Sequence, residues 1–338
     1  MQNELLDFDF CTIHVPWPWF RQTEDGRGAM PHCNVRLNPS NSNSRWLAVF
    51  DEPPVDTVTD VPKMRRVLFV TEPPEVKPYP ASYLRQFGTI ITPFAMRNVP
   101  QQMLSIENPC LNWHFGVSMP AVQPSSELSS LEDFRSMLVP TKAKVLSVIC
   151  STKTYTQAQR KRIAFVEKLQ ARFGDAVDVY GRGRNPISDK AQAILPYKYH
   201  LVLENSYLEN SWTEKLSDTW LGYAYPIYLG APNIESCCPS GGLLSLQPDN
   251  DEANLDAIEK LLQEDPWERS LPAIRNCRQW VLETTNIFAR MDRLIREADA
   301  NTCSLPNLSR PEPLRRSSRW QRALLRRAMR FGLYNPFA

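Results

Sequence analysis

The stretch YKYHLVLENSYLENSWTEKLSDTWLGYAYPIYLGAPN, residues 197–233, reads as a strand, a helix and a second strand in close succession. Tyr199 to Glu204 is an apolar run rich in strand-forming residues, which predicts one buried strand. Thr213 precedes an apolar periodicity of helical spacing and is a good N-cap residue, so a helix is expected to begin there. Gly222 closes that helix, and Tyr225 to Gly230 is a second buried strand. The unit is therefore predicted to be β-α-β.

Polar and charged residues cluster in the connection between the first of these strands and the helix. They are Glu204, Asn205, Thr213, Glu214 and Lys215. Ligands of open α/β sheets bind at the carboxyl ends of the strands, and a helix N-terminus offers free N–H groups to phosphate. The sequence therefore predicts a binding site at this edge of the sheet.

A second strand-helix-strand pattern lies upstream. Lys144 to Cys150 and Val177 to Tyr180 are expected strands, and Thr156 to Phe173 is an expected helix between them. The second strand runs into a Gly/Arg loop, GRGRN, at residues 181–185. These are the parts of a nucleotide-binding α/β half-domain. The chain has no Walker lysine motif and no GxGxxG, so NTP hydrolysis and dinucleotide binding are disfavoured.

The overall composition limits the possible number of domains and the possible partners of the chain. With 338 residues, 42% of them hydrophobic, the chain can bury a sizeable core and is expected to form two domains. Its 39 basic residues nearly balance its 37 acidic ones, so nothing in the net charge of +2 indicates a nucleic-acid partner. The eight cysteines form no CxxC pair, which favours a reduced cytosolic protein, and the four histidines lack metal-site spacing. No signal peptide and no membrane span are expected.

Domain boundaries are expected where proline and serine accumulate. Residues 120–143 are the expected interdomain linker, which places a first domain at 1–140 and a second at 141–305. Prolines after residue 305 then set off a tail at 306–338.

Outside the pattern of residues 197–233, further elements can be read from periodicity, although residues 1 to about 60 are hard to assign. Expected strands are Trp46–Phe50, Arg66–Val70, Thr89–Thr92 and Leu243–Leu246, and expected helices are 252–264 and 272–298.

The tail carries a strongly basic amphipathic pattern. Between Ser317 and Phe331, five arginines fall on one side of a helical wheel and apolar residues such as Trp320 and Leu324 fall on the other. This pattern predicts an anchor lying on an anionic membrane surface through residues 315–331. A tail docked on its own protein and a solvated arm are the alternatives.

The blocks ENS, TEKL and PIYLGAPN, in this order and spacing, resemble the donor-binding signature of the α-1,3/1,4-fucosyltransferase family, glycosyltransferase family 10. The resemblance is to the bacterial branch and runs from about Lys144 to Phe288; the match before residue 140 is much thinner. It implies an inverting enzyme that uses GDP-fucose and an α/β fold of the GT-B type, with two Rossmann-like domains facing across a cleft. The acceptor implied is a glycan containing N-acetylglucosamine or glucose, and the enzyme would lie at the cytoplasmic face of the membrane.

The resemblance also implies roles for the donor-side residues. Lys215 and an arginine of the Gly/Arg loop would contact the diphosphate, with Arg182 and Arg184 as equal alternatives, and Glu214 would hold ribose or sugar hydroxyls. Arg162 matches another arginine of the family pattern, or it belongs to a solvated helix face. Glu204 and Asn205 either support the donor contacts or are hydrogen-bonding groups at the strand end. Ser211-Trp212 before Thr213 departs from the aromatic-valine or aromatic-isoleucine pair usual in the family, which we interpret as a subfamily trait.

On the acceptor side, the resemblance puts the catalytic base on Glu72, in FVTEPPE directly after an expected strand. Glu75 and Glu52 are the competing carboxylates, and an ordinary loop carboxylate is the alternative interpretation of Glu72. Trp113 and His114 would line an acceptor pocket, where an aromatic face stacks on a sugar ring, or they belong to a core turn.

A DxD-like sequence, Asp249-Asn250-Asp251, lies outside the donor signature. No cofactor and no metal site are therefore expected, with arginine and lysine taking the place of a cation at the diphosphate. Two other functions stay open: transfer of a different nucleotide-activated sugar, and binding of a sugar nucleotide or glycan without catalysis. A membrane-associated scaffold with inert α/β domains is a third.

Overall fold

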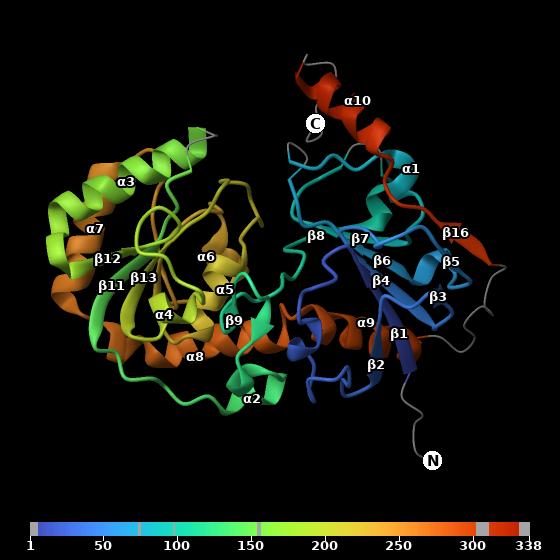
Figure 1. The fold of residues 1–338 in the computed structure, drawn as a ribbon, viewed down its shortest axis with the longest axis horizontal. Helices are drawn as coiled ribbons and strands as arrows, with labels where there is room; N and C mark the ends of the chain where they lie inside the picture. The colour runs from blue at the N-terminus through green and yellow to red at the C-terminus, as the bar shows by residue number, and fades with distance from the viewer. Residues whose placement is uncertain (1–5, 74–75, 97–98, 154–156, 302–310, 331–338) are drawn as a thin grey trace. The chain divides into compact units, whose positions relative to one another are not determined.

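The computed structural model describes residues 6–73, 76–96, 99–153, 157–301 and 311–330 (Figure 1). The chain divides into two compact units, one formed by residues up to Cys110 together with those from Ile287 onward, the other by Leu111–Asn286. Each unit contains its own parallel β-sheet. The prediction of an α/β protein with two such sheets is therefore confirmed.

The sheet of the first unit has the order β2-β1-β4-β6-β7-β8, and every neighbouring pair is parallel. Its strands are β1 (Leu6–Thr12), β2 (Cys33–Leu37), β4 (Trp46–Phe50), β6 (Arg66–Phe69), β7 (Thr89–Thr92) and β8 (Leu104–Ile106). The expected strands at 46–50, 66–70 and 89–92 are confirmed. Strand β1 was not expected because aspartates interrupt its apolar run. Asp9 is nevertheless fully buried, since it accepts hydrogen bonds from Ser44 and pairs with Arg36.

A smaller sheet joins the tail to the first unit. It has the order β16-β5-β3, with β3 at Asn41–Ser42, β5 at Thr57–Thr59 and β16 at Glu312–Leu314. Strand β16 pairs antiparallel with β5 and precedes helix α10 (Arg319–Arg330). The helix expected in the tail is therefore present as α10, and the segment before it is held on the first unit by the pairing of β16 with β5.

The helix expected at 272–298 is two helices, α8 (Trp267–Glu283) and α9 (Ile287–Asn301). The backbone N–H groups of Thr284 and Thr285 both donate to the carbonyl of Trp280, which ends α8. Helix α9 then belongs to the first unit, where Phe288 packs edge-to-face on Phe10 at 5.1 Å between ring centroids. The apolar periodicity continues across the break, so the sequence pattern predicted one helix where the structure has two. Helix α8 packs in the core of the second unit and α9 in that of the first.

The sheet of the second unit has the order β12-β11-β13-β14-β15 and is also parallel throughout. Its strands are β11 (Lys144–Ile149), β12 (Val177–Tyr180), β13 (Tyr197–Leu203), β14 (Tyr225–Leu229) and β15 (Leu244–Ser245). Helix α3 (Gln157–Phe173) connects β11 to β12, and α5 (Glu214–Leu221) connects β13 to β14. Both predicted β-α-β patterns are confirmed. The unit also contains α4 (Ala191–Ile194), α6 (Ile234–Cys237) and α7 (Asp251–Glu264).

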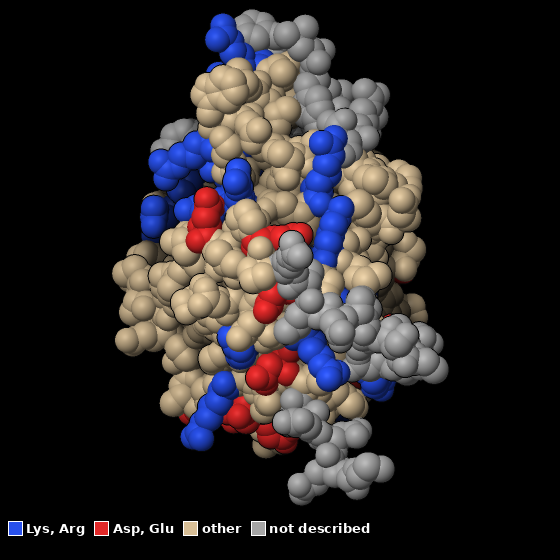
Figure 2. Space-filling view, turned by 90° about the vertical axis from the view of Figure 1, so that its right-hand side faces the viewer, with Lys and Arg blue, Asp and Glu red and all other residues tan. Residues whose placement is uncertain are grey.

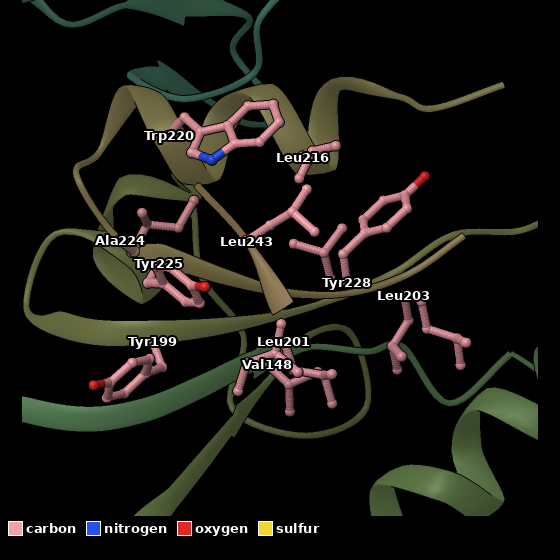
Figure 3. Close-up of a cluster of buried hydrophobic side chains, with 14 of the residues drawn as sticks. Val148, Tyr199, Leu201, Leu203, Leu216, Trp220, Ala224, Tyr225, Tyr228 and Leu243 are labelled. Carbon is pink, nitrogen blue, oxygen red and sulfur yellow. The ribbon is translucent and has the colours of Figure 1, made fainter. Parts of the chain in front are cut away.

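The core of the second unit forms where α5 packs on its sheet. Leu216 and Trp220 of α5 have no exposed surface and lie above Tyr225 and Tyr228 of β14 (Figure 3). Burial of each such side chain stabilises the fold by about 1.5–3 kcal/mol. The indole N–H of Trp220 donates to the carbonyl of Gly242 at 2.8 Å, so its one polar atom is satisfied.

Residues expected to link the domains belong instead to the second core. Helix α2 (Leu131–Ser136) begins with a capping box formed by Ser130 and Asp133, and Phe134 packs on Trp113 at 5.1 Å. The chain therefore passes between the units at residues 110–111 and 286–287, not near 140 and 305. The serines expected in a linker act here as helix caps, and apolar residues among them hold the segment on the core.

Two other sequence expectations concern cysteines and membrane spans. The cysteines within the described residues are unpaired. In the same part of the chain, no helix has the length and apolar character that crossing a membrane requires.

We predict that His200 makes the second unit sensitive to acid. Its ring is buried in β13, with Nδ1 2.7 Å from Ser147 Oγ, and burial lowers the pKa of the imidazole to about 3. Because this pKa lies below that of an unfolded histidine, the stabilising contribution is complete above about pH 6.5 and is lost as the pH falls from there toward 3. The loss at about pH 5 is about 2 kcal/mol.

Urea denaturation of the wild type and of His200→Gln at about pH 7 and about pH 5 measures this contribution. The wild type should lose more stability than the variant between the two values. An equal loss in both would show that His200 is not the responsible group.

Candidate functional site

The carboxyl edge of the second sheet is organised around one buried carboxylate. Glu204 directly follows β13 and is 1% exposed. Its oxygens accept hydrogen bonds from the backbone N–H of Thr213 at 2.7 Å and from the Thr213 hydroxyl. At Gly230, a Cβ atom would lie 2.7 Å from Glu204 Cγ, so only glycine leaves room for this side chain. Glu204 therefore fixes the start of α5 against the end of β13.

Thr213 and Lys215 form the N-terminus of α5. Thr213 is the N-cap residue, as predicted, and its hydroxyl oxygen accepts from the backbone N–H of Lys215. Lys215 Nζ lies 2.9 Å from this hydroxyl, 3.4 Å from Glu204 and 3.5 Å from Glu214. Burial opposes the charge on Lys215, but Glu214 and Glu204 outweigh it and raise the pKa of the ammonium. A lysine cation is thus held at a helix N-terminus, where the helix dipole also favours an anion.

A second ion cluster lies one turn further along α5, and its lysine was missed by the sequence analysis. Lys190 Nζ lies 3.1 Å from Glu214 and 2.8 Å from the fully buried Asp218, which also accepts the backbone N–H of His114. Burial opposes the charge of Glu214, yet Lys190 and Lys215 hold the pKa of this carboxyl well below its usual range. The four-residue spacing of Glu214 and Asp218 places both on one helix face and was a usable signal. Nothing near Lys190 in the sequence pointed to it.

The Gly/Arg loop after β12 gives its two arginines different surroundings. Gly181 has φ +131°, and a Cβ there would lie 2.7 Å from the carbonyl oxygen of Cys150. Arg184 Nη1 donates to Gln170 of α3 at 3.1 Å, whereas the Arg182 side chain is exposed. Arg184 is therefore engaged by the protein, and Arg182 extends from the loop.

Arg162 lies on α3 and points to the same edge of the sheet. Its Nη1 donates to the carbonyl of Leu203, the last residue of β13, at 3.4 Å. The side chain lines a cavity of about 440 Å³ together with Tyr207 and Leu229, a size typical of small-molecule sites. The interpretation of Arg162 as part of a solvated helix face is therefore disfavoured. Asn205 is exposed beside the buried Glu204.

The acidic residues of the DxD-like sequence face lysines. Asp249 lies 2.5 Å from Lys161 Nζ, and Asp251 lies 2.8 Å from Lys168 Nζ. Within the described ranges, no group of three or more histidine, cysteine or acidic side chains is arranged to hold a metal ion. Asp249 and Asp251 each have a lysine as cationic partner. That the protein works without a metal stays a prediction.

In the first unit, the competing base candidates have different environments. Glu72 follows β6, is exposed and lines a cavity with Asp51 and Lys77. Glu52 follows β4, is 1% exposed and makes ion pairs with Arg322 at 2.6 Å and Lys77 at 3.1 Å. Glu75 lies outside the described residues. Glu52 is therefore buried in ion pairs, whereas Glu72 is accessible from solvent.

Trp113 and His114 lie in the second unit. The Trp113 ring is 1% exposed and packed on Phe134, so it offers no face to a sugar. For Trp113, the structure favours the core turn that the sequence left as an alternative. His114 Nε2 lies 3.3 Å from the Asn112 amide, beside the cluster of Lys190, Glu214 and Asp218.

Comparison with known proteins gives one family match. Residues 139–267 match the carboxyl-terminal model of glycosyltransferase family 10 (fucosyltransferase). A fucosyltransferase-like protein of Arabidopsis thaliana is 36% identical over 67 residues, which cover 19% of this chain and only 13% of that protein.

Solved structures that align with this chain include three of α1,3-fucosyltransferases. One with GDP-fucose is 14% identical and has a TM-score of 0.48, covering 90% of this chain and 94% of its own. One with GDP is 16% identical, with a TM-score of 0.48 and coverage of 85% and 93%. A third is 15% identical, with a TM-score of 0.46 and coverage of 80% and 81%.

We predict that Lys190→Met destabilises the second unit by about 3–5 kcal/mol, because it leaves Asp218 buried without its cation. Urea denaturation measures the change. Lys198→Met is the matched control, since Lys198 pairs with the exposed Asp265 and should cost under about 1 kcal/mol. Adding Asp218→Asn to Lys190→Met should restore part of the loss. Equal losses in Lys190→Met and the control would contradict this account of the cluster.

Proposed function

We propose that this chain is a fucosyltransferase with GDP-fucose as its donor, a proposal supported by the match of residues 139–267 to the carboxyl-terminal model of glycosyltransferase family 10. The observation that carries the proposal is the position of Lys215 in the block TEKL. This lysine is held at the N-terminus of α5 by Thr213 and Glu204. A nucleotide diphosphate sugar needs such a cation where its leaving group accumulates negative charge.

The donor would lie along the carboxyl edge of the second sheet. Lys215 and Arg162 would hold the diphosphate with Arg182 or Arg184, and arginine can grip two phosphate oxygens at once. Arg182 is favoured over Arg184 because its side chain is exposed, whereas Arg184 is hydrogen-bonded to Gln170. Glu214 stays ionised beside its two lysines and would accept hydrogen bonds from ribose or sugar hydroxyls. These cations would serve in place of a divalent metal.

Glu72 would act as the general base. It would take the proton of the acceptor hydroxyl while that oxygen attacks the anomeric carbon of fucose. The bond from that carbon to the diphosphate would break on the opposite side, so that the configuration inverts and GDP leaves with the bonding electrons. The acceptor would be a glycan containing N-acetylglucosamine or glucose, joined by an α-1,3 or α-1,4 linkage.

Donor binding tests the proposed role of Lys215. Titration calorimetry should detect GDP-fucose and GDP binding, unchanged by a chelator, with weaker binding of UDP-galactose. Lys215→Ala should weaken GDP-fucose binding about tenfold or more, because it removes a charge-assisted contact to the diphosphate. Lys198→Ala, on the outside of the same unit, is the matched control. Equal binding of all donors would favour a transferase for another sugar nucleotide, and binding of none would refute the proposal.

Turnover tests the proposed role of Glu72 as the general base. Glu72→Gln should leave GDP-fucose affinity unchanged and lower kcat by about 10²–10⁴. Release of GDP in the presence of a panel of N-acetylglucosamine-containing acceptors measures turnover, and Glu127→Gln is the control for an exposed glutamate elsewhere. Normal turnover in Glu72→Gln would move the base to another carboxylate. Donor binding without turnover in the wild type would favour a silent binding protein.

Helix α10 would anchor the protein at the cytoplasmic face of the membrane. Trp320 is 71% exposed and Leu324 is 46% exposed, so the apolar side of the helix is available. In sedimentation with vesicles, the protein should bind phosphatidylglycerol more strongly than phosphatidylcholine, and Trp320→Ser with Leu324→Ser should reduce the binding. If vesicle binding of the Trp320→Ser, Leu324→Ser variant equals that of the wild type, the tail contacts only the protein surface.

A further inference from the structure

A second cavity, of about 500 Å³, lies in the first unit between α10 and the carboxyl ends of two strands. Asp51 comes from the end of β4 and Glu72 from the end of β6, while Arg319, Arg322 and Arg326 come from α10. Figure 2, which views one side of the molecule, shows several basic side chains in the upper part, with acidic ones near them. The tail helix therefore forms one wall of the cavity that contains the proposed base.

Helix α10 is fixed in this position by its basic side. Arg322 Nη1 lies 2.6 Å from the buried carboxylate of Glu52, which also accepts the backbone N–H of Ser317 at 3.1 Å. Arg326 Nη2 donates to the carbonyl of Val76 at 2.7 Å. The spacing of residues 319, 322 and 326 puts all three arginines on one face of the helix. That face contacts the protein through Arg322 and Arg326, as in the alternative of a tail docked on its own protein.

The charges that line the cavity do not balance. Lys77 forms ion pairs with Asp51 at 2.7 Å and with Glu52 at 3.1 Å, and Arg322 forms an ion pair with Glu52. Arg326 donates to a neutral carbonyl, so its charge is not compensated there. Arg319 is exposed and makes no ion pair with the described residues. The lining contains two carboxylates, Asp51 and Glu72, and four cations, two of which are Arg319 and Arg326, so positive charge is in excess even when Glu72 is counted.

We propose that Arg319 and Arg326 make this cavity a subsite for a negatively charged acceptor, a glycan that carries a carboxylate or phosphate group near the hydroxyl to be modified. Guanidinium groups bind such oxyanions with paired hydrogen bonds that neutral sugars cannot replace. The assignment rests on the proposed function, in which Glu72 removes a proton from the acceptor. The tail helix would then select the acceptor, in addition to any contact with lipid made by its opposite side.

Binding of two matched probes tests the subsite without requiring turnover. One is a disaccharide of glucuronic acid and N-acetylglucosamine, and the other has glucose in place of the glucuronic acid. Titration calorimetry with the full chain at low salt should give about tenfold tighter binding of the charged disaccharide. Arg319→Gln with Arg326→Gln should abolish this difference and leave binding of the neutral disaccharide unchanged. A glucose 6-phosphate analogue of the neutral disaccharide distinguishes a preference for phosphate from one for carboxylate.

Arg330→Gln is the matched control, because this arginine also belongs to α10 and does not line the cavity. Arg322 is left intact, since it holds the helix on Glu52. Equal affinity for the two disaccharides, or an equal loss in the control, would overturn the subsite. So would a gain of binding for both disaccharides in the double variant, which would mean that α10 covers the cavity.

Calorimetry with GDP-fucose on the same variants separates the two proposals. Normal donor binding with no preference for charge refutes the subsite alone. A charge preference without donor binding refutes the proposed function alone. Vesicle binding that falls in the double variant while the charge preference stays intact would assign these arginines to lipid and overturn the subsite.

Discussion

The arrangement of the second unit depends on the buried carboxylate of Glu204. An ionised group with 1% exposure is stable only where hydrogen bonds and a cation replace its water, and Thr213 and Lys215 supply both. These contacts tie the end of β13 to the start of α5 across an irregular loop. They also direct the ammonium of Lys215 toward the N-terminus of the helix. Glu204, for which the sequence left two roles open, therefore positions the proposed phosphate-binding lysine.

The charges around Lys215 form a connected series rather than separate pairs. Glu214 lies between Lys215 and Lys190, and Lys190 continues to Asp218 in the core. A carboxylate between two lysines stays ionised, and each lysine is held in one place by its acidic neighbours. A site prepared in this way needs little rearrangement to bind an anion, which is the condition under which electrostatic stabilisation is most effective.

The first unit uses a buried carboxylate for a different purpose. Glu52 has a position after β4 that corresponds to that of Glu72 after β6, and both belong to similar short sequences, DEPP and TEPP. Glu52 binds Lys77, Arg322 and the backbone of Ser317, so it attaches the tail to the unit. Glu72 stays exposed on the cavity wall. The two similar motifs thus differ in burial, because only Glu52 is held in ion pairs with the tail.

The sequence by itself determined the second unit most fully, because its central strands β13 and β14 are almost wholly buried and α5 has a clear N-cap. Its β-α-β order, the N-cap at Thr213 and the grouping of Glu204, Glu214 and Lys215 all follow from short-range patterns. The break between α8 and α9, the division of the chain at residues 110 and 286, and the buried state of Trp113 and Asp9 depended on the tertiary structure. So did Lys190 and the inward-facing arginines of α10. Periodicity shows which residues share a face, but only packing between segments far apart in the chain decides what that face meets.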